Sequence, residues 1–175
     1  MLPEQCCLKI IAVNDVYKID QWPHFATCFQ KESEPTQENV KIISVLPGDF
    51  LAPSLLSSID KGEKLIICIR FLNLSLYFCS CVGHGMVDCM NKSGINYVCF
   101  GNHEADVDMK QMQSRIRESK FTWINSNMQS IPLAADIKLP EYSVIEVFGA
   151  EDHKRRYMYD IQSKLFIQVL IMREP

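Results

Sequence analysis

The sequence carries little excess charge of either sign. Its 18 lysine and arginine residues nearly balance 21 aspartate and glutamate residues, so the formal net charge is only −3 over 175 residues. A nucleic-acid-binding protein usually carries a basic patch or stripe that neutralises phosphates. The slightly acidic balance therefore predicts that nucleic acid is not a partner of this chain.

Signals for secretion and for a cysteine zinc site are also missing. The first residues contain no basic stretch, and the apolar run at 8–13 is too short for the core of a signal peptide. We therefore expect a cytoplasmic chain in which the eight cysteines stay reduced. Cys79 and Cys81 are separated by one residue, whereas zinc knuckles separate such pairs by about two to four. This spacing favours buried thiols over a zinc site.

The composition is that of an ordinary globular domain. Hydrophobic residues make up 47% of the sequence and charged residues 22%, both close to average usage. These fractions exclude a disordered tail, a collagen-like fibre and a coiled-coil rod. A chain of this length is also long enough to bury a core.

Short apolar stretches alternate with stretches of helical period. Residues 8–13, 40–46 and 97–100 are mostly apolar, and the first two are rich in β-branched side chains, which is typical of strands covered on both faces. Residues 20–31 and 106–119 place apolar side chains mostly at intervals of three and four, which predicts helices. Strands that alternate with helices indicate an α/β fold with a largely parallel sheet.

Side chains of metal-ligand type directly follow the three predicted strands. They are Asp15, Asp49, and Asn102 together with His103. Because the carboxyl ends of parallel strands line one edge of a sheet, these side chains converge if the strands are neighbours. Carboxylate, amide and imidazole groups suit divalent ions such as Mn, Fe or Zn. The alternative is that each residue only caps the helix that follows its strand.

Two further apolar stretches lie near the C-terminal end of the sequence. Residues 141–147 predict a strand, and residues 149–156 predict a charged turn. We interpret the basic cluster Lys154-Arg155-Arg156 as the solvated tip of that hairpin. The apolar run at 164–172 fits either a sheet strand or sequence that has diverged.

Three motifs, in order along the chain, are similar to those of a known family. They are Val13-Asn14-Asp15-Val16-Tyr17, Pro47-Gly48-Asp49-Phe50-Leu51-Ala52-Pro53-Ser54 and Gly101-Asn102-His103-Glu104. They resemble the signatures of the calcineurin-like metallophosphoesterases, and within that family the 5′-nucleotidase-related branch. The resemblance implies a metallophosphoesterase-like layered α/β sandwich. It also implies that residues 1–175 form a partial domain, truncated on its C-terminal side.

The resemblance further implies a phosphatase with two divalent metal ions such as Zn, Mn or Fe. Asp15 would hold the first ion, Asp49 would bridge both, and Asn102 would bind the second. Asn102 and His103 would bind substrate, with His103 as the catalytic residue. The implied activity is hydrolysis of phosphate monoesters by a metal-bound hydroxide. The substrate would be a small phosphorylated molecule, with nucleotides and nucleotide catabolism as candidates.

Two departures from the family pattern bear on activity. Tyr17 stands where the family's Asp-x-His motif has histidine, and a phenol is a poor ligand near neutral pH. The sequence also contains no Gly-His-x-His motif downstream of His103. The alternative is therefore a non-catalytic isoform or fragment that holds one ion or none, or that binds a partner.

Residues 65–82, within the segment 63–83, form a nearly unbroken apolar stretch without a period. A membrane span is one interpretation, but Arg70 and Asn73 near its middle would be costly in lipid. We favour an insertion, such as translated intron sequence, that splits one helix. Its removal would place Val87 and Met90 on the helical face that starts at residue 55. A membrane is therefore not expected as a partner.

Overall fold

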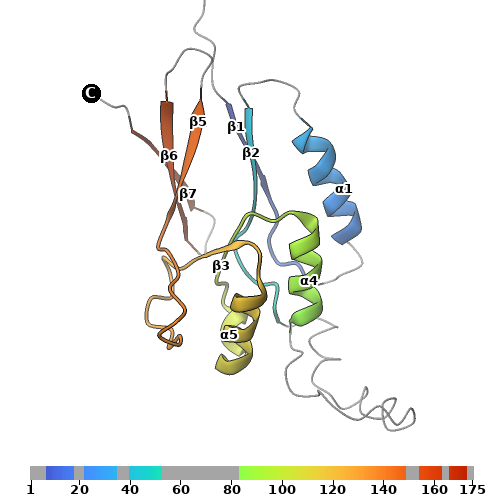
Figure 1. Cartoon of the computed structure of the whole chain (residues 1–175), viewed down its shortest axis with the longest axis vertical. Helices are drawn as coiled ribbons and strands as arrows, with labels where there is room; N and C mark the ends of the chain where they lie inside the picture. Colours follow the sequence, from blue (N-terminus) through green and yellow to red (C-terminus); the bar gives the residue numbers. More distant parts are fainter. Residues whose placement is uncertain are drawn as a thin grey trace, which may run out of the picture.

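The structure, a computed structural model, describes residues 7–17, 22–34, 40–52, 83–148, 154–162 and 166–172, with the backbone alone for Phe148 and the last two ranges. Strands and helices alternate through residue 124, and three further strands follow (Figure 1). In chain order the elements are β1 (Cys7–Ala12), α1 (Trp22–Ser33), β2 (Val40–Leu46), α4 (His84–Ser93), β3 (Tyr97–Cys99), the 3₁₀ helix η2 (His103–Asp106), α5 (Met109–Glu118), β4 (Thr122–Ile124), β5 (Ser143–Phe148), β6 (Lys154–Gln162) and β7 (Phe166–Met172).

The first four strands form one parallel sheet in the order β1-β2-β3-β4. Cys7 pairs with Val40 at the start of β1, and Val45 pairs with Tyr97 at the start of β3. Parallel neighbours need a crossover connection, and a helix lies between each consecutive pair of strands in the chain. The expected α/β fold is confirmed, and the three predicted strands are neighbours, which is the condition for the side chains that follow them to converge.

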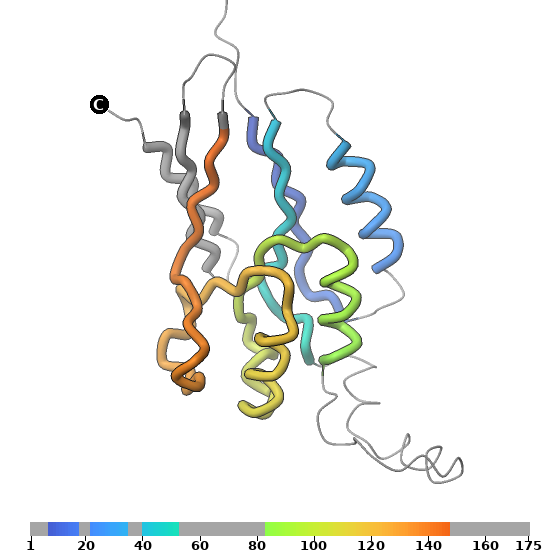
Figure 2. Tube along the Cα trace, viewed as in Figure 1, coloured from blue at the N-terminus to red at the C-terminus, as the bar shows by residue number. Residues whose placement is uncertain are grey.

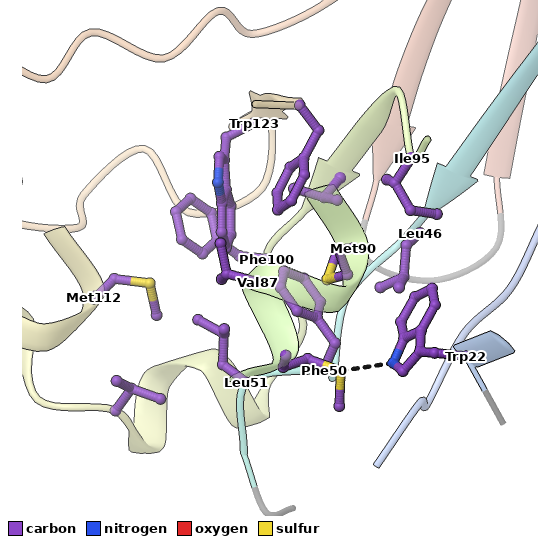
Figure 3. Close-up of a cluster of buried hydrophobic side chains, with 14 residues drawn as sticks. Trp22, Leu46, Phe50, Leu51, Val87, Met90, Ile95, Phe100, Met112 and Trp123 are labelled. Atoms are coloured by element: carbon purple, nitrogen blue, oxygen red, sulfur yellow. Dashed lines mark hydrogen bonds between the residues drawn. The ribbon is translucent and has the colours of Figure 1, made fainter. Parts of the chain in front are cut away.

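One face of this sheet carries the larger apolar core, which α1, α4 and α5 cover (Figures 1 and 3). The Trp123 ring packs against two phenylalanine rings, with centroids 5.3 Å from Phe50 and 4.9 Å from Phe100. The indole N–H of Trp22 donates to the sulfur of Met86 over 2.8 Å, which ties α1 to α4. Burial of each such side chain stabilises the fold by about 2 kcal/mol.

The opposite face of the parallel sheet packs against a second sheet. β5, β6 and β7 pair antiparallel in that order, and β5 and α1 lie on opposite sides of β1 and β2 (Figure 2). Ile145 and Val147 of β5 are buried with Ile43, Val45 and Ile124 of the parallel sheet. The layered α/β sandwich expected from the sequence is therefore present.

The C-terminal expectations are confirmed in part. The strand predicted at 141–147 corresponds to β5, and the apolar run at 164–172 contains β7. The prediction of a charged turn over 149–156 is wrong for residues 154–156, because β6 begins at Lys154 and Arg155 pairs with Val147. The basic cluster therefore belongs to a strand and is not a hairpin tip. Backbone pairing with β5 outweighs the turn preference that the charges indicated.

The hypothesis of an insertion concerns residues that the structure leaves undescribed, except Gly83. Gly83 has a φ of 74° and directly precedes α4. Val87 and Met90 lie on the buried side of α4, as the helical period predicted. Among the described helices, none is long and apolar enough to span a membrane, and the membrane interpretation of the stretch at 65–82 lies outside the described residues.

Candidate functional site

The turn after β1 holds Asp15 beside Tyr17. The hydroxyl of Tyr17 donates to Oδ1 of Asp15 over 2.8 Å, and the side-chain amide of Asn14 donates to Oδ2 over 2.5 Å. Burial, together with the hydrogen bond to Asp15, raises the pKa of Tyr17 above its ordinary value. Tyr17 therefore keeps its proton near neutral pH and acts as a donor to Asp15.

The turn after β2 places Asp49 against the turn after β3. Asp49 is only 9% exposed. Gly48, with a φ of 130°, directly faces the backbone of Gly101, and a side chain there would overlap with that backbone. A side chain at Gly101 would in turn overlap with the carboxylate of Asp49. Both glycines are explained by this close approach of two backbone segments.

The turn after β3 connects His103 to the other two turns. Its backbone N–H donates to Oδ1 of Asp49 over 2.8 Å. The ring of Tyr17 meets the ring of His103 edge-on, with centroids 6.0 Å apart. Nδ1 of His103 lies 2.8 Å from Oδ2 of Asp106, and this hydrogen bond raises the pKa of His103 above its ordinary value.

The structure thus brings the residues predicted for the site to one edge of the parallel sheet. Contacts through Tyr17 and His103 link Asp15 to Asp49, and Asn102 lies next to His103 in the same turn. The Asn102 side chain is exposed and forms no hydrogen bond that caps η2. Simple capping is therefore not what this asparagine does here.

The backbone at two of these residues is unusual. Among the described non-glycine residues, positive φ occurs at Asp15, with 55°, and at Asp49, with 59°. A left-handed conformation costs an ordinary residue about 1 kcal/mol, and such conformations cluster at functional sites. The sequence predicts both residues as metal ligands for a different reason, namely their place after a strand.

Sequence reasoning assigned no role to Glu104, the last residue of the third motif. Its side chain is fully buried and accepts four backbone N–H groups. Oε2 accepts from Asp49 and Gly101, each over 2.7 Å, and Oε1 accepts from Phe50 over 2.9 Å and Leu51 over 3.0 Å. Burial raises the pKa of Glu104 above its ordinary value, and the four donors act in the opposite direction.

The side chains at this edge are of the types that bind divalent ions. Asp15, Asp49 and Asn102 supply carboxylate and amide oxygens, which suit ions such as Mn²⁺. Within the described part of the chain, no three His, Cys, Asp or Glu side chains form a group that could hold a metal ion. The described residues therefore do not complete a metal site by themselves.

Comparison with solved structures identifies the fold. The chain is similar to a calcineurin-like phosphoesterase, YfkN, from Bacillus subtilis, with a TM-score of 0.54 and 17% identity over 87% of this chain. It is also similar to a 5′-nucleotidase precursor from Thermus thermophilus, with a TM-score of 0.55 and 14% identity over 95% of this chain. The fold is thus that of the calcineurin-like phosphoesterases, the family that the three motifs resemble.

The matched proteins are considerably longer than this chain. The alignment covers 46% of the Bacillus protein and 32% of the Thermus protein, so the chain spans less than half of either. No family model matches the sequence, and no curated protein matches it.

Proposed function

We propose that this chain carries part of the active site of a metal-dependent phosphomonoester hydrolase. The observation that carries the proposal is the convergence of Asp15, Asp49 and the Asn102-His103 pair at the carboxyl edge of three adjacent parallel strands. That edge is where open α/β sheets bind their ligands. The phosphoesterase fold of the two matched proteins supports the same reaction class.

Asp49, Asn102 and Asp15 would hold the divalent ion. When bound, such an ion neutralises phosphate charge and makes a nucleophile available from water near neutral pH. The second ion that the family resemblance implies would need ligands beyond the described residues. The substrate class is a small phosphate monoester, with nucleotides among the candidates.

His103 would bind the phosphoryl group and hold the proton for the leaving oxygen. Its Nδ1 already contacts Asp106, so Nε2 is the nitrogen that remains for substrate. The partner carboxylate favours the protonated imidazole, which is the form that a general acid needs. Asn102, exposed beside it, would orient a phosphate oxygen through its side-chain amide.

Hydrolysis of p-nitrophenyl phosphate and of AMP, with added Mn²⁺ or Zn²⁺, tests this proposal. We expect turnover that requires the ion and falls by about a hundredfold or more in Asp49→Asn. Asp136→Asn is the matched control, because Asp136 is an exposed carboxylate paired with Arg117. Turnover that survives in Asp49→Asn, or that falls equally in Asp136→Asn, would contradict the proposed site.

A second candidate is a non-catalytic module that binds an ion or a partner. The incomplete group of ligands among the described residues favours it. This alternative predicts saturable Mn²⁺ binding that Asp49→Asn removes, with no turnover of either substrate above that of the metal-free protein. Activity of the wild-type chain would exclude it.

A further inference from the structure

Glu104 joins two loops that are far apart in the sequence. The segments 47–51 and 100–104 follow β2 and β3 and touch backbone to backbone at their glycines. Oε2 of Glu104 accepts from one N–H in each segment, that of Asp49 and that of Gly101. Oε1 accepts from the next two N–H groups of the first segment. A single carboxylate therefore satisfies donors from both loops.

The four donors explain why a carboxylate can be buried at this point. An unpaired charge is costly to remove from water, and the Glu104 side chain is fully buried. Hydrogen bonds from N–H to a carboxylate are stronger than those between neutral groups. The backbone donors would themselves be costly if left unpaired, so the loops and the carboxylate depend on one another.

The placement of Glu104 also bears on Asp49, one of the residues proposed to hold the ion. Asp49 contributes its backbone N–H to Glu104 and its carboxylate Oδ1 to the N–H of His103. The left-handed φ of Asp49, 59°, is strained for a residue with a side chain. Hydrogen bonds from Asp49, Phe50 and Leu51 to Glu104 hold the backbone in that conformation on both sides of its Cα.

We propose that Glu104 is a positioning residue, which locks the loop of Asp49 to the loop of Asn102 and His103 so that their side chains face one ligand. The assignment of that ligand rests on the proposed function, whereas the locking of the loops does not. Glu104 itself, buried beneath the site, would not touch metal or substrate.

Hydrogen exchange of the wild-type chain tests the locking without any ligand. We expect the amides of Asp49, Phe50, Leu51 and Gly101 to be protected as strongly as those of β2 and β3, although they lie outside both strands. Exchange of these four amides at the rate of exposed loops would overturn the proposal, whatever the chain does with metal.

Glu104→Gln tests the positioning with little change of shape. In either orientation of the amide, its NH₂ group faces two backbone N–H donors, so two of the four hydrogen bonds are lost. We expect faster exchange confined to the four amides, and binding of Mn²⁺, followed by electron paramagnetic resonance, that is weaker by about tenfold or more. Ile145→Ala, which opens a cavity on the other face of the sheet, is the control for lost stability. It should change Mn²⁺ affinity by less than about twofold.

The outcomes separate this proposal from the proposed function. Wild-type affinity in Glu104→Gln, or an equal loss in Ile145→Ala, would overturn the positioning role. If the wild type binds no Mn²⁺ while the four amides are protected, the proposed function fails and the locking of the loops stands. Should Glu104→Gln not fold, Glu104→Asp keeps the charge but shortens the reach, and the same local loss of protection is expected.

Discussion

Asp15 and Asp49 combine a strained backbone with a position at the end of a strand. Their φ angles of 55° and 59° turn the chain sharply where β1 and β2 end. Glycine adopts a positive φ at lower cost than aspartate, yet neither position is glycine. Gly48 directly precedes Asp49 in the sequence. A carboxylate is kept where glycine would cost less, which is the pattern expected when function requires the side chain.

The contact between the two loops leads to the first prediction. In Gly101→Ala the new methyl group would overlap with the Asp49 carboxylate and backbone, so we expect the free energy of unfolding to fall by about 3 kcal/mol. Gly94→Ala is the control, because its methyl group would meet only the edge of the Phe29 ring, at 3.1 Å, and its cost comes instead from a positive φ of 79°. That change should cost about 1 kcal/mol. Urea unfolding measures both, and equal losses would contradict the close approach of the loops.

The ion pair of His103 gives a prediction about pH. Because Asp106 raises the pKa of His103, the pair stabilises the folded chain at acid pH, and this contribution is lost as the pH rises through the raised pKa. In Asp106→Asn we expect the pKa of His103 to fall towards its ordinary value, measured by NMR titration of the imidazole. Asp136→Asn should leave it unchanged, because Asp136 pairs with Arg117. An unchanged pKa in Asp106→Asn would contradict the hydrogen bond.

The start of helix α5 is fixed by its N-cap residue, Asp108. The Asp108 side chain accepts from the backbone N–H of Lys110 over 3.0 Å and caps the helix. Asp108→Ala should lower the free energy of unfolding by about 1 kcal/mol, whereas Asp108→Ser should restore most of it. Thermal unfolding followed by circular dichroism distinguishes the two variants. Equal stability of Asp108→Ala and the wild type would show that the cap is not needed.

Elements with a strong period were predictable from the sequence, and their connections were less so. The strands that begin at Val40 and Tyr97 are read directly from apolar, β-branched runs, because a strand buried on both faces tolerates little else. The role of Glu104 could not be read in the same way. Three of its four partners are backbone groups 53–55 residues away, at Asp49 to Leu51, and only the fold brings them together.

At the scale of the whole molecule, the parallel sheet is enclosed between helices and a second sheet. Ile145 faces the parallel sheet and is 4% exposed, while its neighbour Val144 points away and is 43% exposed. Ile145→Ala should therefore lower the free energy of unfolding by about 3 kcal/mol, and Val144→Ala by less than about 0.5 kcal/mol. Urea denaturation of the two variants measures the packing between the sheets. Similar losses would contradict the assigned face of β5.

The residues of the candidate site that belong to the three sequence motifs were predictable from the sequence. The place after a strand marks Asp15, Asp49, Asn102 and His103 in the sequence, and the fold brings them to one edge. The role of Tyr17 was left open by the sequence, because only the contact between its hydroxyl and Asp15 shows it as a donor. Three-dimensional contacts of this kind have no periodic signal along a chain.

The central claim is that three loops, at the ends of three adjacent strands, form one site for a divalent ion. Titration of the isotopically labelled chain with Mn²⁺, followed by paramagnetic broadening in NMR spectra, tests it most directly. We predict that the signals of Asp15, Asp49, Asn102 and His103 broaden together at low ion concentration, before those of the acidic groups on α4 and α5. Broadening that begins at Asp88 or Glu118, or that affects only one of the three loops, would contradict the account.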